Sequence, residues 1–424
     1  MENKKAIGLL FTANIISGIA QGLSLLAIPW YFAATLNQTS IFAMSMVGVT
    51  IVSMFWQVYA GALIDRYSRK WLFVIGSLIM GAFLMGVGIW GTYSSFLPAA
   101  LVIVVYGSNQ LFFNVHYPAL YAFAQEITPP EHYGKINSWI EIQGQFTRIV
   151  AGALGAILLA GTDEGSNIMG IPLHLSIPIA PWELWDILLL DAGTYFLAAI
   201  IISQIKYKPI AERKYVPEPL IARIKQGASF LKQNPLVFNF GFFSHILFAV
   251  VLVQITILLP VYVNEFLNKG ADVFASGQAW YSIGALSSGL FLRHIFRNRL
   301  TVAATMINMI IASGVMLYLA FGQHIGLFFA ATLFIGITNA GTRITRVTFL
   351  FNQIPNHLIG RCNSAFSILN TGFRGLIIGL FSLTYFSEAP TASMGYLVGA
   401  LAVLISVFAI YRTRKQLFPL SDRL

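Results

Sequence analysis

The chain is a succession of long apolar stretches separated by short polar or basic turns. Each stretch is roughly 20 residues or longer, enough for a helix to cross a hydrocarbon layer about 30 Å thick. The apolar runs are continuous and show no alternation at every second residue, so they predict helices and not the strands of a barrel. The predicted spans lie near residues 6–35, 41–63, 71–93, 97–123, 137–160, 183–205, 236–263, 274–293, 300–322, 325–350, 363–386 and 391–411.

Composition supports a membrane protein. Hydrophobic residues make up 57% of the chain and charged residues 10%, whereas a soluble domain carries about 25% charged residues. So few charges cannot cover the surface of a water-soluble globule of this size. We therefore predict an all-α integral membrane protein with twelve transmembrane helices. The first apolar stretch is too long for the core of a signal peptide, so we expect it to stay as a span.

Basic residues are distributed unevenly between the turns. With twelve spans, 21 of the 26 Lys and Arg residues fall on the side that also holds both termini, and only Lys269 falls on the other side. This bias predicts that both termini are cytoplasmic, in the inner membrane of a bacterium. It also predicts attraction to anionic membrane lipid. The net charge of +10 is thus a topology signal, and we expect no binding to nucleic acid.

The two halves of the chain repeat each other in the same orientation. The stretch from Pro129 to Arg148 matches Pro355 to Arg374 with an offset of 226, and Pro29…Asn37 matches Pro260…Asn268 with an offset of 231. We therefore expect two pseudo-symmetric six-helix bundles with a substrate site at their interface. The predicted domains are 1–205 and 236–424, joined by a cytoplasmic linker at 206–235 that contains an amphipathic helix over Pro219–Lys232.

The turn after the second span carries the most specific motif, Gly61-Ala-Leu-Ile-Asp65-Arg66-Tyr-Ser-Arg69-Lys70. It resembles the loop signature of the major facilitator superfamily, although Ser replaces the usual Gly before Arg69. The resemblance implies the major facilitator fold and alternating access by rocking of two bundles. It also implies that the acidic and basic residues of this loop help to hold the cytoplasmic side closed. In the alternative interpretation, the basic residues serve only the topology.

A narrower resemblance rests on Pro118-Ala119, Gln125-Glu126-Ile127, Asn137-Ser138, the segment Ile224 to Pro235, and Asp191. These stretches are similar to the branch that contains macrolide exporters, siderophore exporters and lysophospholipid transporters. The resemblance implies efflux of an amphipathic small molecule. Drug exporters often carry Gly-Pro-x-x-Gly-Gly in the fifth span, and this chain has no proline there, which weakens the case for a standard drug:proton antiporter.

Polar side chains inside the spans are candidates for substrate binding, because a charge in hydrocarbon needs a partner or a water-filled cavity. Arg148 and Arg374 lie near the middle of two equivalent spans. The predicted binding residues are Asn14, Gln21, Gln110, Asn114, Tyr117, Gln145, Arg148, His245, Asn339, Arg346, Asn370 and Arg374.

The two mid-span arginines can be interpreted in two ways. They can offer a fork of donors to a phosphate or carboxylate of the substrate, or they can be paired structurally, Arg148 with Glu141 or with backbone carbonyls. Arg343 and Arg346 lie nearer the cytoplasmic end, where such side chains extend to the membrane surface. Candidates for proton coupling are Asp191, His116 and Glu141.

The leading functional hypothesis is a monomeric secondary transporter that exports an amphipathic compound. The alternative is transport of a lysophospholipid or another anionic amphiphile between leaflets. A non-transporting membrane receptor is a third hypothesis. The sequence contains no His-Glu-x-x-His motif, no catalytic Ser/His/Asp grouping and no cysteine cluster, so we expect neither an enzyme nor a cofactor.

Overall fold

The computed structural model describes residues 4–162, 167–172, 179–206, 220–295, 301–388 and 391–421. Within these residues, eleven helices are long and apolar enough to cross a membrane. The prediction of twelve spans included residues 274–293, and this stretch lies in α10 (Ala271–Ile295). That helix has sufficient length, but its serines and Gln278 lower its hydropathy, so it is not among the eleven.

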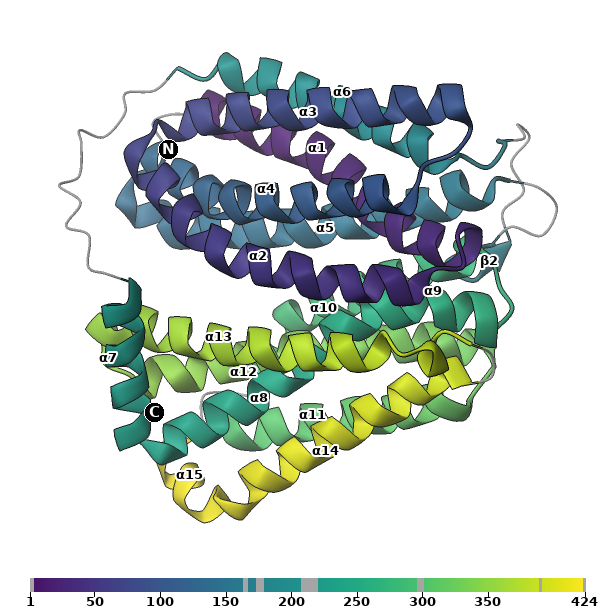
Figure 1. Cartoon of the computed structure of the whole chain (residues 1–424). Helices are drawn as coiled ribbons and strands as arrows, with labels where there is room; N and C mark the ends of the chain where they lie inside the picture. Colours follow the sequence, from purple (N-terminus) through teal and green to yellow (C-terminus); the bar gives the residue numbers. More distant parts are fainter. Residues whose placement is uncertain are drawn as a thin grey trace. The chain divides into compact units, whose positions relative to one another are not determined.

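The first of two compact units comprises Met1–Gln38, Ser45–Val216 and Gly270–Ala279. It holds α1 (Lys4–Trp30), which continues into a π-helical turn at Tyr31–Thr35, and most of α2 (Thr39–Arg66). It also holds α3 (Arg69–Ser94), α4 (Ala99–Glu126), α5 (Tyr133–Ala160) and α6 (Leu184–Ser203). Figure 1 shows α3 and α6 running side by side, in agreement with their extensive packing. Leu10, Leu120, Phe123 and Ile140 are buried where α1, α4 and α5 meet.

The second unit comprises Thr39–Met44, Pro217–Lys269 and Trp280–Leu424. Its helices are α7 (Leu220–Gln233), α8 (Pro235–Val253), α9 (Leu259–Val261), most of α10, α11 (Thr301–Phe321), α12 (Ile325–Gln353), α13 (Asn356–Phe381), α14 (Met394–Arg412) and α15 (Arg414–Ser421). π-Helical turns at Gln254–Leu258 and Tyr262–Phe266 extend α8 and α9. Large apolar side chains such as Leu376 (73% exposed) and Ile405 (66%) are exposed on this unit, as expected for a membrane protein.

The internal repeat extends to backbone detail. Asn37 and Asn268 are both in the left-handed region, with φ of 52° and 49°. Each ends a π-helical stretch, Tyr31–Thr35 and Tyr262–Phe266, that follows a proline, Pro29 or Pro260. Proline removes a backbone donor and disturbs the helical ladder, and Asn tolerates the left-handed conformation that ends a helix. The same residues thus produce the same helix ending in both halves.

The loop between α5 and α6 contains a short hairpin that the sequence did not predict. Strands β1 (Asn167–Ile168) and β2 (Ile171–Pro172) pair antiparallel. The two turn residues, Met169 and Gly170, both have positive φ, which is the backbone of a two-residue hairpin turn. Met169 is an unusual residue at such a position, and its N–H donates to the Ser276 hydroxyl at 2.8 Å.

Helices α10 and α12 approach each other through glycines. A Cβ at Gly284 would lie 2.0 Å from the Leu333 carbonyl oxygen, and one at Gly336 would lie 2.0 Å from the Tyr281 carbonyl oxygen. Two backbones can pack this closely in a membrane only where the facing residues are small.

We therefore expect Gly336→Val to separate these helices and to destabilise the second unit by about 1–3 kcal/mol, the usual cost of overpacking. The melting temperature of the purified protein would decrease. The matched control is Gly314→Val in α11, where an added Cβ meets nothing within 4 Å. Equal melting temperatures for the two variants would contradict the predicted contact.

Candidate functional site

A cluster of polar aromatic and acidic side chains joins α4 and α5 in the first unit. Tyr121 donates to Glu141 Oε1 at 2.7 Å, and Tyr117 donates to the same oxygen at 3.0 Å. The two phenol oxygens lie 3.2 Å apart. Helical spacing of four residues places both tyrosines on one face of α4. The pair of hydroxyls therefore orients the Glu141 carboxylate and compensates part of its loss of hydration.

Arg148 lies at the middle of α5, and its side chain is exposed. Its charge acts on Tyr117, so the guanidinium is near the tyrosine and glutamate cluster. Among the described residues, no hydrogen bond or ion pair of this guanidinium is found. The alternative in which Glu141 neutralises Arg148 is thus not the arrangement present, because Tyr117 and Tyr121 are the observed partners of Glu141.

The face of α5 that carries Arg148 is turned toward protein. Gly152 lies one turn after Arg148, and a Cβ added there would be 2.8 Å from Ala279 Cβ and 3.0 Å from the Ala275 carbonyl oxygen. Both alanines belong to the first turns of α10, inside the first unit. A lipid-facing stripe would not be covered by another helix one turn away. The face of α5 that carries Arg148 is therefore not a lipid-facing one.

Other predicted residues of the first unit form hydrogen-bonded pairs, either between two helices or between successive turns of one helix. His116 Nε2 lies 2.9 Å from Asn14 Oδ1, which joins α4 to α1. Gln110 donates to the Tyr106 hydroxyl at 2.9 Å, within α4. Gln145 Oε1 is buried and accepts no hydrogen bond from the described residues. Asn114 is half-buried on α4. The structure thus brings His116 and Asn14 together, and places Gln110 apart with Tyr106.

Asp191 is fully buried in α6 and is directed at α1. The Ser24 hydroxyl donates to Asp191 Oδ2 at 2.6 Å, and Gln21 donates to the Tyr195 hydroxyl at 3.1 Å one turn away. Two hydrogen bonds therefore connect α1 and α6 in register. Asp191 Oδ1 finds no hydrogen-bond donor among the described residues, which is unusual for a buried carboxylate oxygen.

In the second unit, the predicted residues bind mainly backbone. Arg346 Nη1 donates to the Ser244 carbonyl at 3.0 Å, and Asn370 donates to the His245 carbonyl at 3.1 Å. His245 Nδ1 lies 2.6 Å from the Gly241 carbonyl oxygen, and its ring stacks on Phe366. Arg346 is 5% exposed, so the expectation that it extends to the membrane surface is wrong. Its guanidinium is held inside the unit by the carbonyl on α8.

Two further predicted residues lie in the same unit. Asn339 donates to the Tyr281 hydroxyl at 2.7 Å, which links α12 to α10. Arg374 is half-buried on α13, one turn after Asn370. The structure therefore divides the predicted set into two groups, one in each unit.

The basic loop after α2 is attached to the ends of other helices in the first unit. Arg69 forms an ion pair with Glu126 at the end of α4. The Lys70 ammonium donates to the carbonyls of Ser203 and Ile205, at 2.6 and 2.9 Å, at the end of α6. A cation at the carboxyl end of a helix also interacts favourably with its dipole. Arg66 is exposed and lies against Tyr67. The Asp65 side chain lies outside the described residues.

Several partners were missed at the sequence level. Tyr121 could have been found from its spacing of four residues after Tyr117, and Tyr195 from the same spacing after Asp191. Ser24 and Tyr281 carry no such signal, because serines and tyrosines are frequent in these spans. Among the described residues, no group of three or more His, Cys, Asp or Glu side chains could hold a metal ion. The candidate site on α5 presents one carboxylate, Glu141, and one guanidinium, Arg148.

Comparison with known proteins agrees with this architecture. Macrolide efflux protein A of Streptococcus pyogenes is 24% identical over 292 residues, which cover 66% of this chain and 65% of that protein. The aligned region is thus just under two thirds of the relative's length. The family profile of the Major Facilitator Superfamily matches residues 10–379.

Solved structures share the fold at low sequence identity. The nucleoside transporter NupG matches with a TM-score of 0.70 at 16% identity, over 97% of this chain and 99% of that one. A bacterial homologue of the iron transporter ferroportin matches with a TM-score of 0.69 at 16% identity, over 96% of this chain and 98% of that one. A bacterial homologue of the human lysosomal transporter Spinster matches with a TM-score of 0.71 at 11% identity, over 96% of each chain.

The match to the family profile covers most of the chain, and the helical architecture agrees with it. The protein is therefore a membrane transporter and not an enzyme, and it belongs to the Major Facilitator Superfamily.

Proposed function

We propose that this transporter exports an amphipathic small molecule by alternating access, with Arg148, Glu141 and Tyr117 recognising the polar part of the substrate. The observation that carries the proposal is the Arg148 guanidinium, which is exposed at the middle of a membrane-spanning helix beside an oriented carboxylate. A charge in this position is costly unless water or a ligand solvates it. The similarity to a macrolide efflux protein supports export of an amphipathic compound.

The other parts of the proposal rest on the sequence. The asymmetry of Lys and Arg along the chain supports cytoplasmic termini and insertion in the inner membrane of a bacterium. The repeat supports two bundles, 1–205 and 236–424, with Arg374 and Asn370 contributing from the second. Asp65 and the basic residues after it are proposed to stabilise the cytoplasmically closed state. Arg69 and Lys70 already bind the ends of α4 and α6, so in this proposal Asp65 provides the charge for the closing contact.

Transport of an anionic amphiphile, such as a lysophospholipid, is the second candidate function. The specific observation in its favour is again Arg148, because a guanidinium donates to phosphate or carboxylate through a planar fork. Arg374 occupies the equivalent position of the second half. A neutral macrolide would use the hydroxyls and amides of the site but would not need either guanidinium.

Arg148→Ala should separate the two candidates. If the substrate is anionic, its transport would decrease by about tenfold or more, since a hydrogen bond to a charged group contributes roughly 1.5–3 kcal/mol. Flux of a lysophospholipid and of a neutral macrolide would be measured in proteoliposomes that contain each variant. Arg148→Lys should restore part of the flux, because it keeps the charge and loses the fork.

Arg412→Ala is the matched control, because Arg412 lies in the last turn of α14, outside the proposed site. If Arg148→Ala lowers macrolide flux as much as lysophospholipid flux, the guanidinium has a structural role and the anion site is excluded. If it lowers neither flux, Arg148 does not take part in recognition.

We also propose that Asp191 carries the coupled proton, with His116 and Glu141 as the other candidates. Asp191 is fully buried and one of its oxygens has no donor among the described residues. Such an oxygen is available to bind a proton, and proton binding would change the hydrogen bond to Ser24 on α1. A bond between helices that depends on protonation is a physical means of coupling.

Asp191→Asn should keep the side-chain shape but remove the titrating group. We expect it to abolish efflux driven by a proton gradient while exchange of substrate without net flux continues. The control on the same helix is Asp186→Asn, which alters only the first-turn cap of α6. Gradient-driven efflux at the wild-type rate in Asp191→Asn would assign coupling to another residue. Loss of both activities would indicate a purely structural role.

A further inference from the structure

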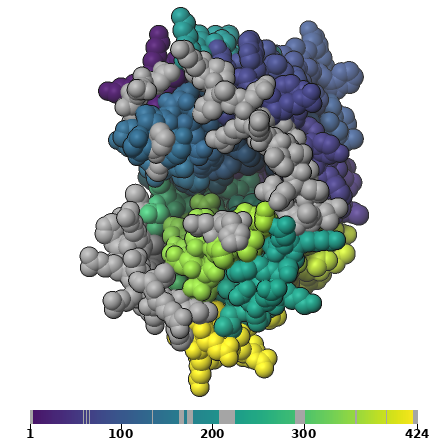
Figure 2. Space-filling model, turned by 90° about the vertical axis from the view of Figure 1, so that its left-hand side faces the viewer, coloured from purple at the N-terminus to yellow at the C-terminus, as the bar shows by residue number. Residues whose placement is uncertain are grey.

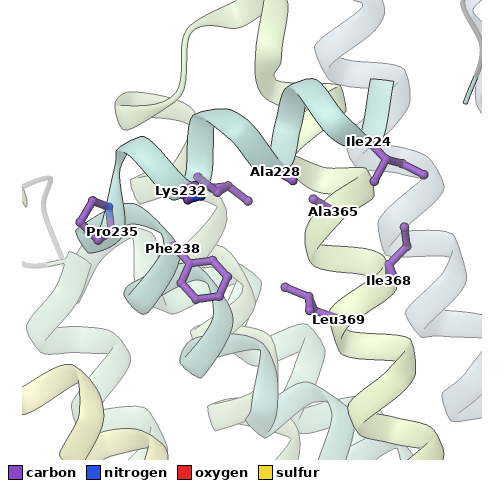
Figure 3. A pocket seen from close by; sticks show the side chains of 9 residues that line it. Ile224, Ala228, Lys232, Pro235, Phe238, Ala365, Ile368 and Leu369 are labelled. Carbon is purple, nitrogen blue, oxygen red and sulfur yellow. The ribbon is translucent and has the colours of Figure 1, made fainter. Parts of the chain in front are cut away.

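A cavity of about 450 Å³ lies in the second unit, bounded by α7, the first turn of α8 and the early part of α13. Figure 3 shows Ile224 and Ala228 on α7 above the space, Phe238 on α8 beside it, and Ile368 and Leu369 on α13 across from it. These walls are apolar. None of these side chains belongs to the polar groups proposed to bind the transported substrate.

A close contact between α7 and α13 lies next to the cavity. A Cβ at Gly227 would lie 2.2 Å from the Arg361 carbonyl oxygen and 2.9 Å from the Cys362 nitrogen. Glycine therefore allows α7 to rest directly on the backbone of α13, and Leu231 is buried next to this contact. Figure 2 shows α7 (teal) next to the green surface of α13. The roof of the cavity is thus a fixed part of the second unit.

The cavity lies beside the amphipathic helix α7, near the start of α8. Figure 1 shows α7 lying across α8 and α13, as expected for a helix on a membrane surface. Phe238 lies one turn into α8, about 5 Å along its axis. Leu369 lies eight residues after Arg361, where α13 contacts α7, about 12 Å along the helix. An apolar space that extends from α7 along α8 and α13 can hold an acyl chain.

Lys232 provides the charge at this boundary. Among the described residues it is the one charged residue that lines the cavity, and its side chain is exposed at the carboxyl end of α7. Lys225 lies two turns earlier and is also exposed. A lysine whose stem lies along apolar walls can keep its ammonium at the level of lipid phosphates. Basic pockets on the cytoplasmic side of membrane helices bind anionic headgroups in this way.

We propose that this cavity binds one anionic phospholipid of the cytoplasmic leaflet, with an acyl chain along Ala228, Phe238 and Leu369 and the phosphate at Lys232. The bound lipid would join α7 to α8 and α13. A peptide would be a poor occupant, because its backbone groups would need hydrogen-bond partners that these apolar walls do not supply. The proposal is independent of the substrate of transport.

The test is native mass spectrometry of the full-length protein in detergent, titrated with phosphatidylglycerol or phosphatidylcholine. Wild type should bind phosphatidylglycerol about fivefold more tightly, the effect of one basic residue next to an anionic lipid. Lys232→Gln should remove this preference and leave phosphatidylcholine binding unchanged. The matched control, Lys415→Gln, replaces an exposed lysine on α15 and should keep the preference.

Ala228→Trp tests the chain-binding part of the cavity. The Ala228 side chain is exposed to the space, so a larger side chain should enter it without displacing backbone, and binding of both lipids should decrease tenfold or more. Equal affinities of wild type for the two lipids would overturn the proposal. So would a Lys232→Gln variant that behaves like Lys415→Gln, or a folded Ala228→Trp variant that binds lipid as wild type does.

Discussion

The structure depends on one constraint, namely that a polar group inside hydrocarbon must find a partner within the protein. Because lipid is as apolar as leucine, burial alone does not bring membrane helices together, and hydrogen bonds and close packing must do so. The bond from Ser24 to Asp191 joins α1 to α6, and that from Arg346 to the Ser244 carbonyl joins α12 to α8. Polar residues that suggested a binding site therefore also define which helices are neighbours.

The two halves meet this constraint differently, although their sequences repeat. In the first unit, Glu141 is bound by two tyrosine hydroxyls and Arg148 remains exposed near them. In the second unit, Arg346 Nη1 and the Asn370 amide donate to backbone carbonyls of α8, whereas Arg346 Nε is buried with no partner among the described residues. Side chains that bind backbone within their own unit have fewer donors left for a ligand. The bonds of Arg346 and Asn370 thus contribute to helix packing in the second unit, whereas the described residues of the first unit leave Arg148 without a hydrogen bond or ion pair.

Much of the architecture follows from the sequence, because hydropathy and proline position act locally. The spans and the repeat are visible in the chain, and the matching left-handed conformations of Asn37 and Asn268 follow from it. Pairing between helices could not be predicted, because it depends on how each helix is rotated about its axis. For this reason the Arg69–Glu126 ion pair was missed, and Arg346 was expected at the membrane surface. Helix α10 occupies a predicted span, and its buried serines lower its hydropathy.

The loop after α2 shows how a short motif can contribute to transport without touching substrate. Arg69 binds the end of α4 and Lys70 binds the end of α6, so the beginning of α3 is joined to two other helix ends on one side of the unit. Such contacts resist sliding of single helices and favour movement of the bundle as one body. Alternating access by rocking requires this property, because the free energy of substrate binding must move whole bundles and not bend one helix. Arg69 and Lys70 therefore do more than mark topology in the fold, because they hold the start of α3 against the ends of α4 and α6.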